Sequence, residues 1–212
     1  MVTSSLVSTR PEQAPRRSRR TARDLPQLAI IGLGYWGPNL VRNFHTQTGC
    51  LLRACCDVDA RRLDALHADY PTIDLVDDPA DLFSDDEISG VVIATPVETH
   101  YPLAKAALLA GKSVLIEKPL TADVGQAEEL VALADERRLT LMVDHTFVHS
   151  PAVAKIKQLF DDGELGELLF IDSVRINLGL IQPDVNVIWD LAPHDLSIVD
   201  YLLGRLPNSV SA

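Results

Sequence analysis

Two side chains, His194 and Lys118, have the chemistry that oxidation of a secondary alcohol requires. In that reaction a hydride leaves the carbon atom while a proton leaves the oxygen atom. A histidine near its ordinary pKa of ~6.5 accepts such a proton at neutral pH, and a nearby lysine stabilises the developing alkoxide by its charge. Either residue could instead be structural, Lys118 as a surface lysine and His194 as a histidine satisfied by its neighbours.

A glycine-rich turn follows the first apolar run of the chain and has the form G-x-G-x-x-G. In this pattern Gly32 permits the tight turn, Gly34 lets the backbone approach a pyrophosphate, and Gly37 lets a helix pack closely on a strand. A lone pattern of this kind also arises by chance as a purely structural turn. The residues expected to contact a dinucleotide here are Gly32, Gly34, Tyr35, Trp36 and Gly37.

An acidic residue supports the dinucleotide interpretation. Asp57 ends the next apolar run, 20 residues after Gly37, where an acid binds the adenosine ribose hydroxyls. Its charge would repel the 2′-phosphate of NADP, so we expect NAD as the cofactor. Arg61 and Arg62 lie close enough to leave NADP as the less favoured alternative.

The elements that must position these residues alternate along the chain. Short apolar runs predict strands, and the amphipathic stretches between them predict helices. Strands are expected at 28–32, 51–56, 90–95, 113–117 and 139–144, and helices at 38–46, 60–69, 99–110 and 122–138. Val124, Ala127, Val131 and Ala134 form the expected buried face of the last helix. This alternation predicts an α/β fold, a doubly wound parallel sheet of the Rossmann type.

Polar residues gather where the later strands end. Ligands of an open α/β sheet bind at the carboxyl ends of its strands, so these residues would meet a cofactor and its substrate. His100 and His145 could instead be structural, and Glu117 could be the partner of a buried polar group. The candidates for cofactor contact are Thr95, Pro96, His100, Glu117 and Lys118, and His145 is a candidate for substrate contact.

The motifs E-K-P at 117–119 and W-D-L-A-P-H-D at 189–195, with the glycine-rich turn, resemble the glucose-fructose oxidoreductase and inositol dehydrogenase family (Gfo/Idh/MocA). The resemblance extends from about residue 27 to the end of the chain. It implies that Lys118 holds the substrate hydroxyl, that Pro119 follows a cis peptide bond and that His194 transfers the proton. Asp190 resembles the acid paired with that histidine, although a helix beginning at Pro193 would leave Asp190 outside it.

The substrate is less defined. Family versions of the 187–195 stretch usually begin with glycines, which are absent here. The W-D-L-A-P-H-D form is most similar to branches acting on nucleotide-linked sugars. We therefore expect a sugar, a polyol or a nucleotide sugar.

Residues 146–212 are expected to form a substrate and oligomerisation domain that is incomplete as written. Ser150 would cap a helix whose buried side is Val153, Ile156, Leu159 and Phe160. A strand is expected at 167–178, a helix at 193–203 and the beginning of a strand at 208–212. Arg175 and Asn177 are candidates for contacting a polyhydroxylated substrate, or else lie on a solvated strand face.

Composition limits the classes of function. The chain has 212 residues and a formal net charge of −11, which disfavours nucleic acid as a partner. The first 24 residues contain six arginines and few large apolar side chains, which predicts a loose basic tail before a nucleotide-binding domain at 25–145. No apolar run is long enough to span a membrane. The alternative is that the arginine-rich tail binds nucleic acid. That binding would be sensitive to salt and would disappear when residues 1–24 are removed.

The cysteine pattern predicts neither disulfides nor a metal site. Cys50, Cys55 and Cys56 are odd in number and lack C-x-x-C spacing, as in a cytoplasmic protein with reduced core thiols.

Together, these features of the sequence predict an NAD(P)-dependent oxidoreductase in the cytoplasm that forms homo-oligomers. The alternative is a dinucleotide-binding protein without catalysis, either a remnant or a redox-sensing partner.

Overall fold

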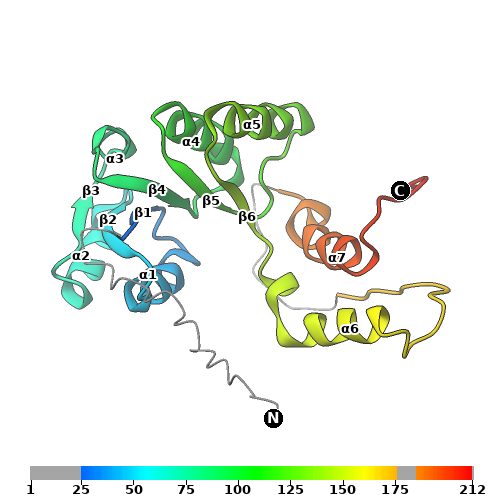
Figure 1. Ribbon diagram of the computed structural model, residues 1–212. Coiled ribbons are helices and arrows are strands. Elements are labelled where there is room, and N and C mark those ends of the chain that lie inside the picture. Colours follow the sequence, from blue (N-terminus) through cyan, green and yellow to red (C-terminus); the bar gives the residue numbers. More distant parts are fainter. Residues whose placement is uncertain (1–24, 176–184, 212) are drawn as a thin grey trace, which may run out of the picture.

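The computed structural model describes residues 25–175 and 185–211. The predicted basic tail and Asn177 therefore lie outside the described residues. Six parallel strands form one sheet in the order β3-β2-β1-β4-β5-β6 (Figure 1). This confirms the predicted α/β fold with a doubly wound parallel sheet. The strands are β1 (Gln27–Ile31), β2 (Leu51–Cys56), β3 (Asp74–Val76), β4 (Ile88–Ile93), β5 (Ser113–Glu117) and β6 (Leu141–Asp144).

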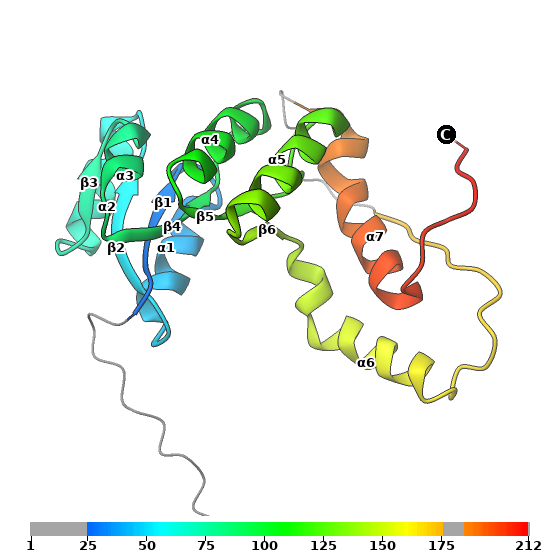
Figure 2. The ribbon, with the colours of Figure 1, turned by 45° about the horizontal axis from the view of Figure 1, so that its top comes forward.

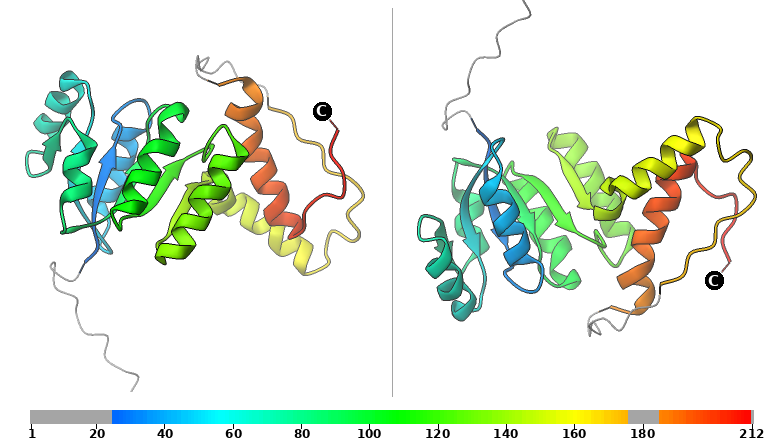
Figure 3. Two further views of the ribbon diagram at one scale, coloured as in Figure 1. Left: turned by 90° about the horizontal axis from the view of Figure 1, so that it is seen from above. Right: turned by 90° about the horizontal axis from the view of Figure 1, so that it is seen from below.

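Helices cover both faces of the sheet, which explains why the strands are nearly apolar throughout. Figure 3 shows α4 and α5 over the face seen from above and α1 over the face seen from below. Ile31, Val91 and Ile116 are buried toward the first face, and Ile30 and Val92 toward the second. The helices of this half are α1 (Gly37–Thr46), α2 (Ala60–Asp69), α3 (Pro79–Ser84), α4 (Val97–Leu109) and α5 (Val124–Arg137).

The order of strands reverses beside β1, which pairs with β2 on one side and with β4 on the other. The chain moves outward to β3 and then returns to β4 on the opposite side of β1. The helices after β1 and β4 therefore leave the sheet in opposite directions, and a crevice opens between the two strand ends. Both the glycine-rich turn and the loop with Thr95 and Pro96 lie at this reversal.

Beyond β6 the described chain is helical. The 3₁₀ turn η2 (Thr146–His149) leads into α6 (Pro151–Asp161), and α7 (Val187–Leu203) packs against both (Figure 2). The Ser150 hydroxyl accepts a hydrogen bond from the Val153 amide, which confirms the predicted helix cap. Gly204 ends α7 in a left-handed conformation.

The structure corrects the predicted strands of this region. Residues 167–175 form no strand, and 208–211 form none either; the remainder of both predicted strands lies outside the described residues. A strand requires a hydrogen-bonded neighbour, and the described part of this region supplies none. Sequence alternation alone was therefore an insufficient guide.

The predicted start of the last helix was also wrong. Asn186 accepts hydrogen bonds from the Ile188 and Trp189 amides through its side-chain oxygen, so α7 begins at Val187. Pro193 lies inside the helix, and Asp190 lies in its first turn rather than outside it.

Other differences concern burial and short elements. In α5 the buried residues are Leu130 and Ala134, whereas Val124 and Val131 are exposed because they lie around the helix from that face. In α6 Val153 is buried, but Ile156 is exposed because no layer in the described chain covers its side. The sequence prediction missed β3 and α3, whose runs are short and flanked by acids.

Candidate active site

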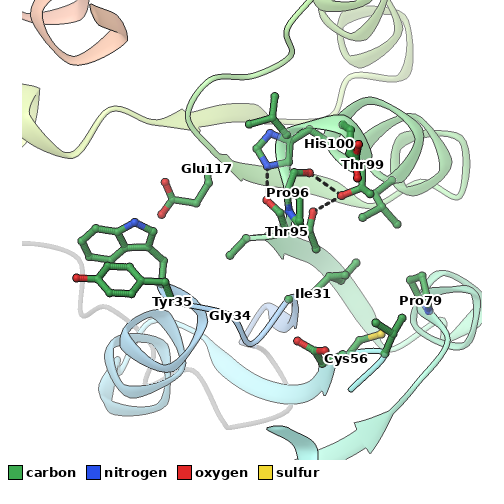
Figure 4. A pocket seen from close by; sticks show the side chains of 18 of the residues that line it. Ile31, Gly34, Tyr35, Cys56, Pro79, Thr95, Pro96, Thr99, His100 and Glu117 are labelled. Carbon is green, nitrogen blue, oxygen red and sulfur yellow. Dashed lines mark hydrogen bonds between the residues drawn. The ribbon is translucent and has the colours of Figure 1, made fainter. Parts of the chain in front are cut away.

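A cavity of about 840 Å³ opens at the carboxyl ends of β1, β2, β4 and β5 (Figure 4). Ten of the eleven residues predicted to contact the cofactor line it; the exception is Gly37. Asp190, predicted as the acid that pairs with the catalytic histidine, also lines this cavity. The size and the position at the strand reversal are those of a dinucleotide site.

The glycines of the turn have three different surroundings. Gly32 has a φ of 95°, and a Cβ atom added there would lie 2.6 Å from the Ala94 carbonyl oxygen. A Cβ atom on Gly37 would collide with the Gly32 carbonyl group, so Gly37 brings α1 against the turn. A Cβ atom added to Gly34 would meet only Arg62 Nη1, at 4.0 Å, so there is open space beside this glycine. Only Gly34 therefore offers its backbone to a ligand.

Asp57 is fixed at the end of β2 and is 5% exposed. Its carboxylate accepts hydrogen bonds from the Leu33 amide at 2.7 Å and from the Asp59 amide at 2.8 Å. Arg62 Nη1 lies 3.2 Å from the same carboxylate. Arg61 instead forms an ion pair with Asp59 at 2.8 Å and is not among the residues that line the cavity. Of the two arginines, Arg62 is therefore the one placed beside the ribose end of a dinucleotide.

His100 connects two loops of the site. Its ring nitrogens lie 2.9 Å from the carbonyl oxygens of Pro119 and Thr95 (Figure 4 shows the second contact). The ring is almost completely buried. This arrangement favours the structural interpretation of His100, which holds the end of β4 beside the E-K-P loop.

The E-K-P loop brings Lys118 onto α7. The Lys118–Pro119 peptide bond is cis, as predicted. Lys118 Nζ lies 2.8 Å from the Asp190 carboxylate and 2.6 Å from the Asp190 carbonyl oxygen. The lysine side chain is 13% exposed and that of Asp190 24%. Asp190 is thus the partner of Lys118, and the sequence prediction had paired it with His194 instead.

Glu117 points into the cavity opposite the loop that carries Gly34 and Tyr35 (Figure 4). Its pKa is raised to about 7 by burial and, to a lesser degree, by the negative charge of Asp144. The two acids are register partners at the ends of β5 and β6. At neutral pH Glu117 therefore exists partly as a neutral carboxylic acid, which can donate a hydrogen bond.

His194 lies on α7 one turn beyond Asp190. Burial lowers its pKa to about 4, and the charges of Lys118, Arg175 and His145 act in the same direction. Its ring is therefore neutral at pH 7, and it is a weaker base than the histidine of ordinary pKa, ~6.5, that the sequence led us to expect. Its Nδ1 atom is buried and has no hydrogen-bond partner among the described residues. His194 does not belong to the described lining of the 840 Å³ cavity.

His145 shares some of these properties. Its Nδ1 atom is also buried without a hydrogen-bond partner among the described residues, and burial lowers its pKa. It borders a second hollow of about 520 Å³ between η2 and α7. His145 thus lies near His194 but outside the larger cavity.

Arg175 does not occupy the polar strand face that the sequence predicted. Its Nε atom forms an ion pair with Asp195 at 2.7 Å, and its guanidinium lies over the ring of Phe147. Sequence reasoning assigned no role to Asp195 or Phe147. The position of Asp195 directly after His194 could have indicated a role for this acid, whereas nothing in the sequence pattern indicated a role for Phe147.

The described residues form neither a metal centre nor a membrane-spanning helix. No group of three or more His, Cys, Asp or Glu side chains in the described residues is arranged to hold a metal ion. Cys55 and Cys56 are buried in the sheet, and Cys50 is partly buried. Within the described ranges, no helix is both long and apolar enough to cross a membrane.

Comparison with known proteins gives a consistent result. The family model GFO_IDH_MocA, described as an oxidoreductase family with an NAD-binding Rossmann fold, matches residues 27–145. The chain is 39% identical over 199 residues to the uncharacterized oxidoreductase YdgJ of Escherichia coli K12, covering 87% of this chain and 55% of YdgJ. It is 31% identical to the UDP-N-acetylglucosamine 3-dehydrogenase of Acidithiobacillus ferrooxidans, covering 86% of this chain and 56% of that enzyme.

A solved structure extends the comparison. GenD2 from gentamicin A biosynthesis, in complex with NAD, superposes with a TM-score of 0.73 at 26% identity. The match covers 91% of this chain and 57% of GenD2. The chain thus spans about half the length of the relatives it matches. Because the family model matches more than half of the sequence, the chain belongs to the Gfo/Idh/MocA family of oxidoreductases with an NAD-binding Rossmann fold.

Proposed function

We propose that this chain binds NAD in the 840 Å³ cavity and is an oxidoreductase acting on a secondary alcohol of a sugar, polyol or nucleotide sugar. One observation carries the proposal: the contact between Lys118 and Asp190, 72 residues apart, holds α7 and its His194 beside the E-K-P loop. The contact brings the Lys118 ammonium group to the lining of the dinucleotide-sized cavity, and the neutral His194 lies one helical turn beyond Asp190, close enough for the Lys118 charge to act on it.

The residues present fit a dinucleotide. The open backbone at Gly34 would face the pyrophosphate just before the start of α1. Asp57 would accept hydrogen bonds from the adenosine ribose, and its charge supports NAD over NADP. Thr95, Pro96 and Glu117 lie toward the E-K-P end of the cavity and would surround the nicotinamide. A neutral Glu117 could donate a hydrogen bond there.

When bound, NAD supplies the hydride acceptor. Lys118 would hold the substrate hydroxyl and stabilise the negative charge that develops on its oxygen. His194, neutral above about pH 4, would accept the hydroxyl proton. Asp190 keeps the Lys118 ammonium group in place through its ion pair. Arg175 is removed from the substrate contacts by its pairing with Asp195, and His145 remains a candidate for contact with the far side of the substrate.

The substrate class rests on the resemblance of the 189–195 motif and on the name of the UDP-N-acetylglucosamine relative. We further propose that residues 25–145 form the nucleotide-binding domain, and that residues 146–212 contribute to substrate binding and to contacts in a cytoplasmic homo-oligomer. Exposed apolar side chains on α7 support the last point.

The proposal is tested by thermal shift with NAD, NADP and a panel of sugars, myo-inositol and nucleotide sugars, followed by absorbance at 340 nm. We expect NAD to raise the melting temperature and at least one alcohol to raise it further only when NAD is present. Binding of NAD with no additional shift from any alcohol would favour the non-catalytic alternative. No shift with either cofactor would contradict the proposal entirely.

A further inference from the structure

We propose that Phe147 and Arg175 are positioning residues that hold the imidazole of His194 in one orientation; this inference rests on the proposed function. The three side chains come from separate segments: Phe147 from η2, Arg175 from the irregular stretch before the undescribed residues, and His194 from α7.

The contacts form a continuous series. The ring of Phe147 meets that of His194 edge to face, with centroids 4.8 Å apart and planes at 85°. The Arg175 guanidinium carbon lies 4.9 Å from the Phe147 centroid on its face. Arg175 Nε then pairs at 2.7 Å with Asp195, the residue that follows His194 on α7. The series therefore begins and ends on neighbouring residues of one helix.

A second bond strengthens this closure. The Ser173 hydroxyl donates to the other Asp195 carboxylate oxygen at 2.8 Å. Residues 171–175 have no helix or strand, so no backbone ladder fixes them. The two bonds to Asp195 tie this stretch to α7, and through it they hold Arg175 over Phe147.

The imidazole of His194 needs neighbours that fix its orientation, because no hydrogen bond from a described residue holds its Nδ1 atom. A proton-accepting histidine is usually oriented by a carboxylate or carbonyl group bonded to the nitrogen that does not react. Here the Nδ1 atom of His194 has no such partner in the described residues. An edge-to-face aromatic contact has a preferred geometry, so it can restrict the ring in place of a hydrogen bond.

The same side chains set the electrostatic surroundings of the ring. The charges acting on His194 are those of Lys118, Arg175 and His145, which lower its pKa, and of Asp195, which raises it. Lys118 is itself paired with Asp190, while Asp144 and His149 act on His145. Removing the Arg175 charge should therefore raise the pKa of His194, and removing the Asp195 charge should lower it.

Nuclear magnetic resonance of the full 212-residue chain, labelled in its histidine rings, tests this without turnover. The His194 signal is assigned by its loss in His194→Gln and titrated between pH 3 and 8, a range that includes its pKa of about 4. In Arg175→Gln we expect a midpoint higher by ~0.5 or more. In Asp195→Asn, whose amide oxygen still accepts from Arg175, we expect a midpoint no higher than that of the parent. Lys155→Gln, which removes a distant surface charge on α6, is the control and should change nothing.

The ring contact is tested in parallel. Phe147→Leu should change the His194 ring shifts and, in a preparation that turns over, lower kcat about tenfold while leaving KM nearly unchanged. Phe147→Tyr keeps an aromatic ring at this position, so its His194 ring shifts and its kcat should stay close to those of the parent. Arg175→Lys keeps the charge and should leave the His194 midpoint near that of the parent, which provides a folded comparison if Arg175→Gln is unstable.

The outcomes separate the two proposals. An unchanged His194 midpoint in Arg175→Gln would overturn the positioning role whether or not the chain is active. A midpoint that rises in both Arg175→Gln and Asp195→Asn would do the same. Unchanged ring shifts in Phe147→Leu would overturn the part played by the aromatic contact. If the His194 midpoints shift as expected in a chain that oxidises no alcohol, the positioning of His194 by Phe147 and Arg175 would stand. The proposed function would be contradicted.

Discussion

Lys118 Nζ lies 2.8 Å from the Asp190 carboxylate, and this contact joins the end of β5 to the first turn of α7. Both side chains are largely shielded from solvent, with exposures of 13% and 24%. A charged pair in such surroundings is strongly destabilised when one partner is removed, because the other charge is left without compensation. The pair therefore both secures α7 and presents the ammonium group to the cavity.

The first prediction concerns Lys118 and His194. In preparations that turn over, Lys118→Ala and His194→Ala should each lower kcat by ~100-fold or more, because positioned acid–base groups typically contribute 10²–10⁴. NAD affinity, measured by titration calorimetry, should remain nearly unchanged. Near-parental turnover in either variant would refute the role of that residue. A joint loss of NAD binding would indicate damage to the fold instead.

The second prediction concerns the choice of cofactor. NAD should bind more tightly than NADP, and Asp57→Asn should narrow the difference because it removes the charge that repels the 2′-phosphate. Asp59→Asn is the matched control, since Asp59 caps α2 two residues away but does not line the cavity. Calorimetric titration of both cofactors gives the comparison. Equal or tighter binding of NADP by the parent chain would contradict the assignment and point to Arg62 as a phosphate contact.

The third prediction follows from the pKa of Glu117. Between the ordinary glutamate pKa of ~4.3 and about 7, the folded chain retains a proton that the unfolded chain has released. The free energy of unfolding should therefore fall as the pH rises through this window. Glu117→Gln should remove that loss, so that the variant gains stability over the parent at pH 7–8 and matches it near pH 4.

Urea unfolding across this pH range measures the effect. Glu136→Gln, on the exposed side of α5, should follow the parent at every pH. Asp144→Asn should lower the pKa of Glu117 and reduce the pH dependence without abolishing it, because burial is the larger cause. An identical pH profile in Glu117→Gln and the parent would show that Glu117 is ionised as an ordinary surface acid.

The fourth prediction concerns association. Leu169, Phe170, Ile188 and Leu196 are between 63% and 83% exposed, and large apolar surfaces of this kind usually bury themselves against another chain. Size-exclusion chromatography with light scattering should show species larger than the monomer. The double substitution Leu169→Ser and Phe170→Ser should reduce them, whereas Leu109→Ser at the end of α4 should not. A monodisperse parent monomer would contradict this prediction.

The nucleotide-binding half could be predicted well because its signals are local. Strands covered on both faces are continuous apolar runs, and the turn requires glycine at Gly32 for its positive φ and at Gly37 for close packing. The β3 strand was not predicted because its three residues are too few to show the apolar pattern of a strand. Its place in the sheet comes from pairing with β2.

The second half depended on contacts that no local pattern contains. The alternation at 167–175 resembled a strand, but strand formation requires a neighbour to accept its hydrogen bonds. The partnership of Asp190 with Lys118 joins residues 72 positions apart, and the N-cap at Asn186 moved Asp190 into the helix. Long-range pairing of this kind is a property of the folded chain, and sequence spacing could not reveal it.

Transfer of deuterium from carbon to NAD tests the central claim most directly. The chain would be incubated with NAD and alcohols deuterated at the reacting carbon, drawn from sugars, inositols and nucleotide sugars, and the cofactor would be analysed by mass spectrometry, which detects even a slow reaction. We predict singly deuterated NADH with at least one substrate, and its loss in both Lys118→Ala and His194→Ala. Binding of NAD by the parent chain with no deuterium in the cofactor for any member of the panel would contradict the account.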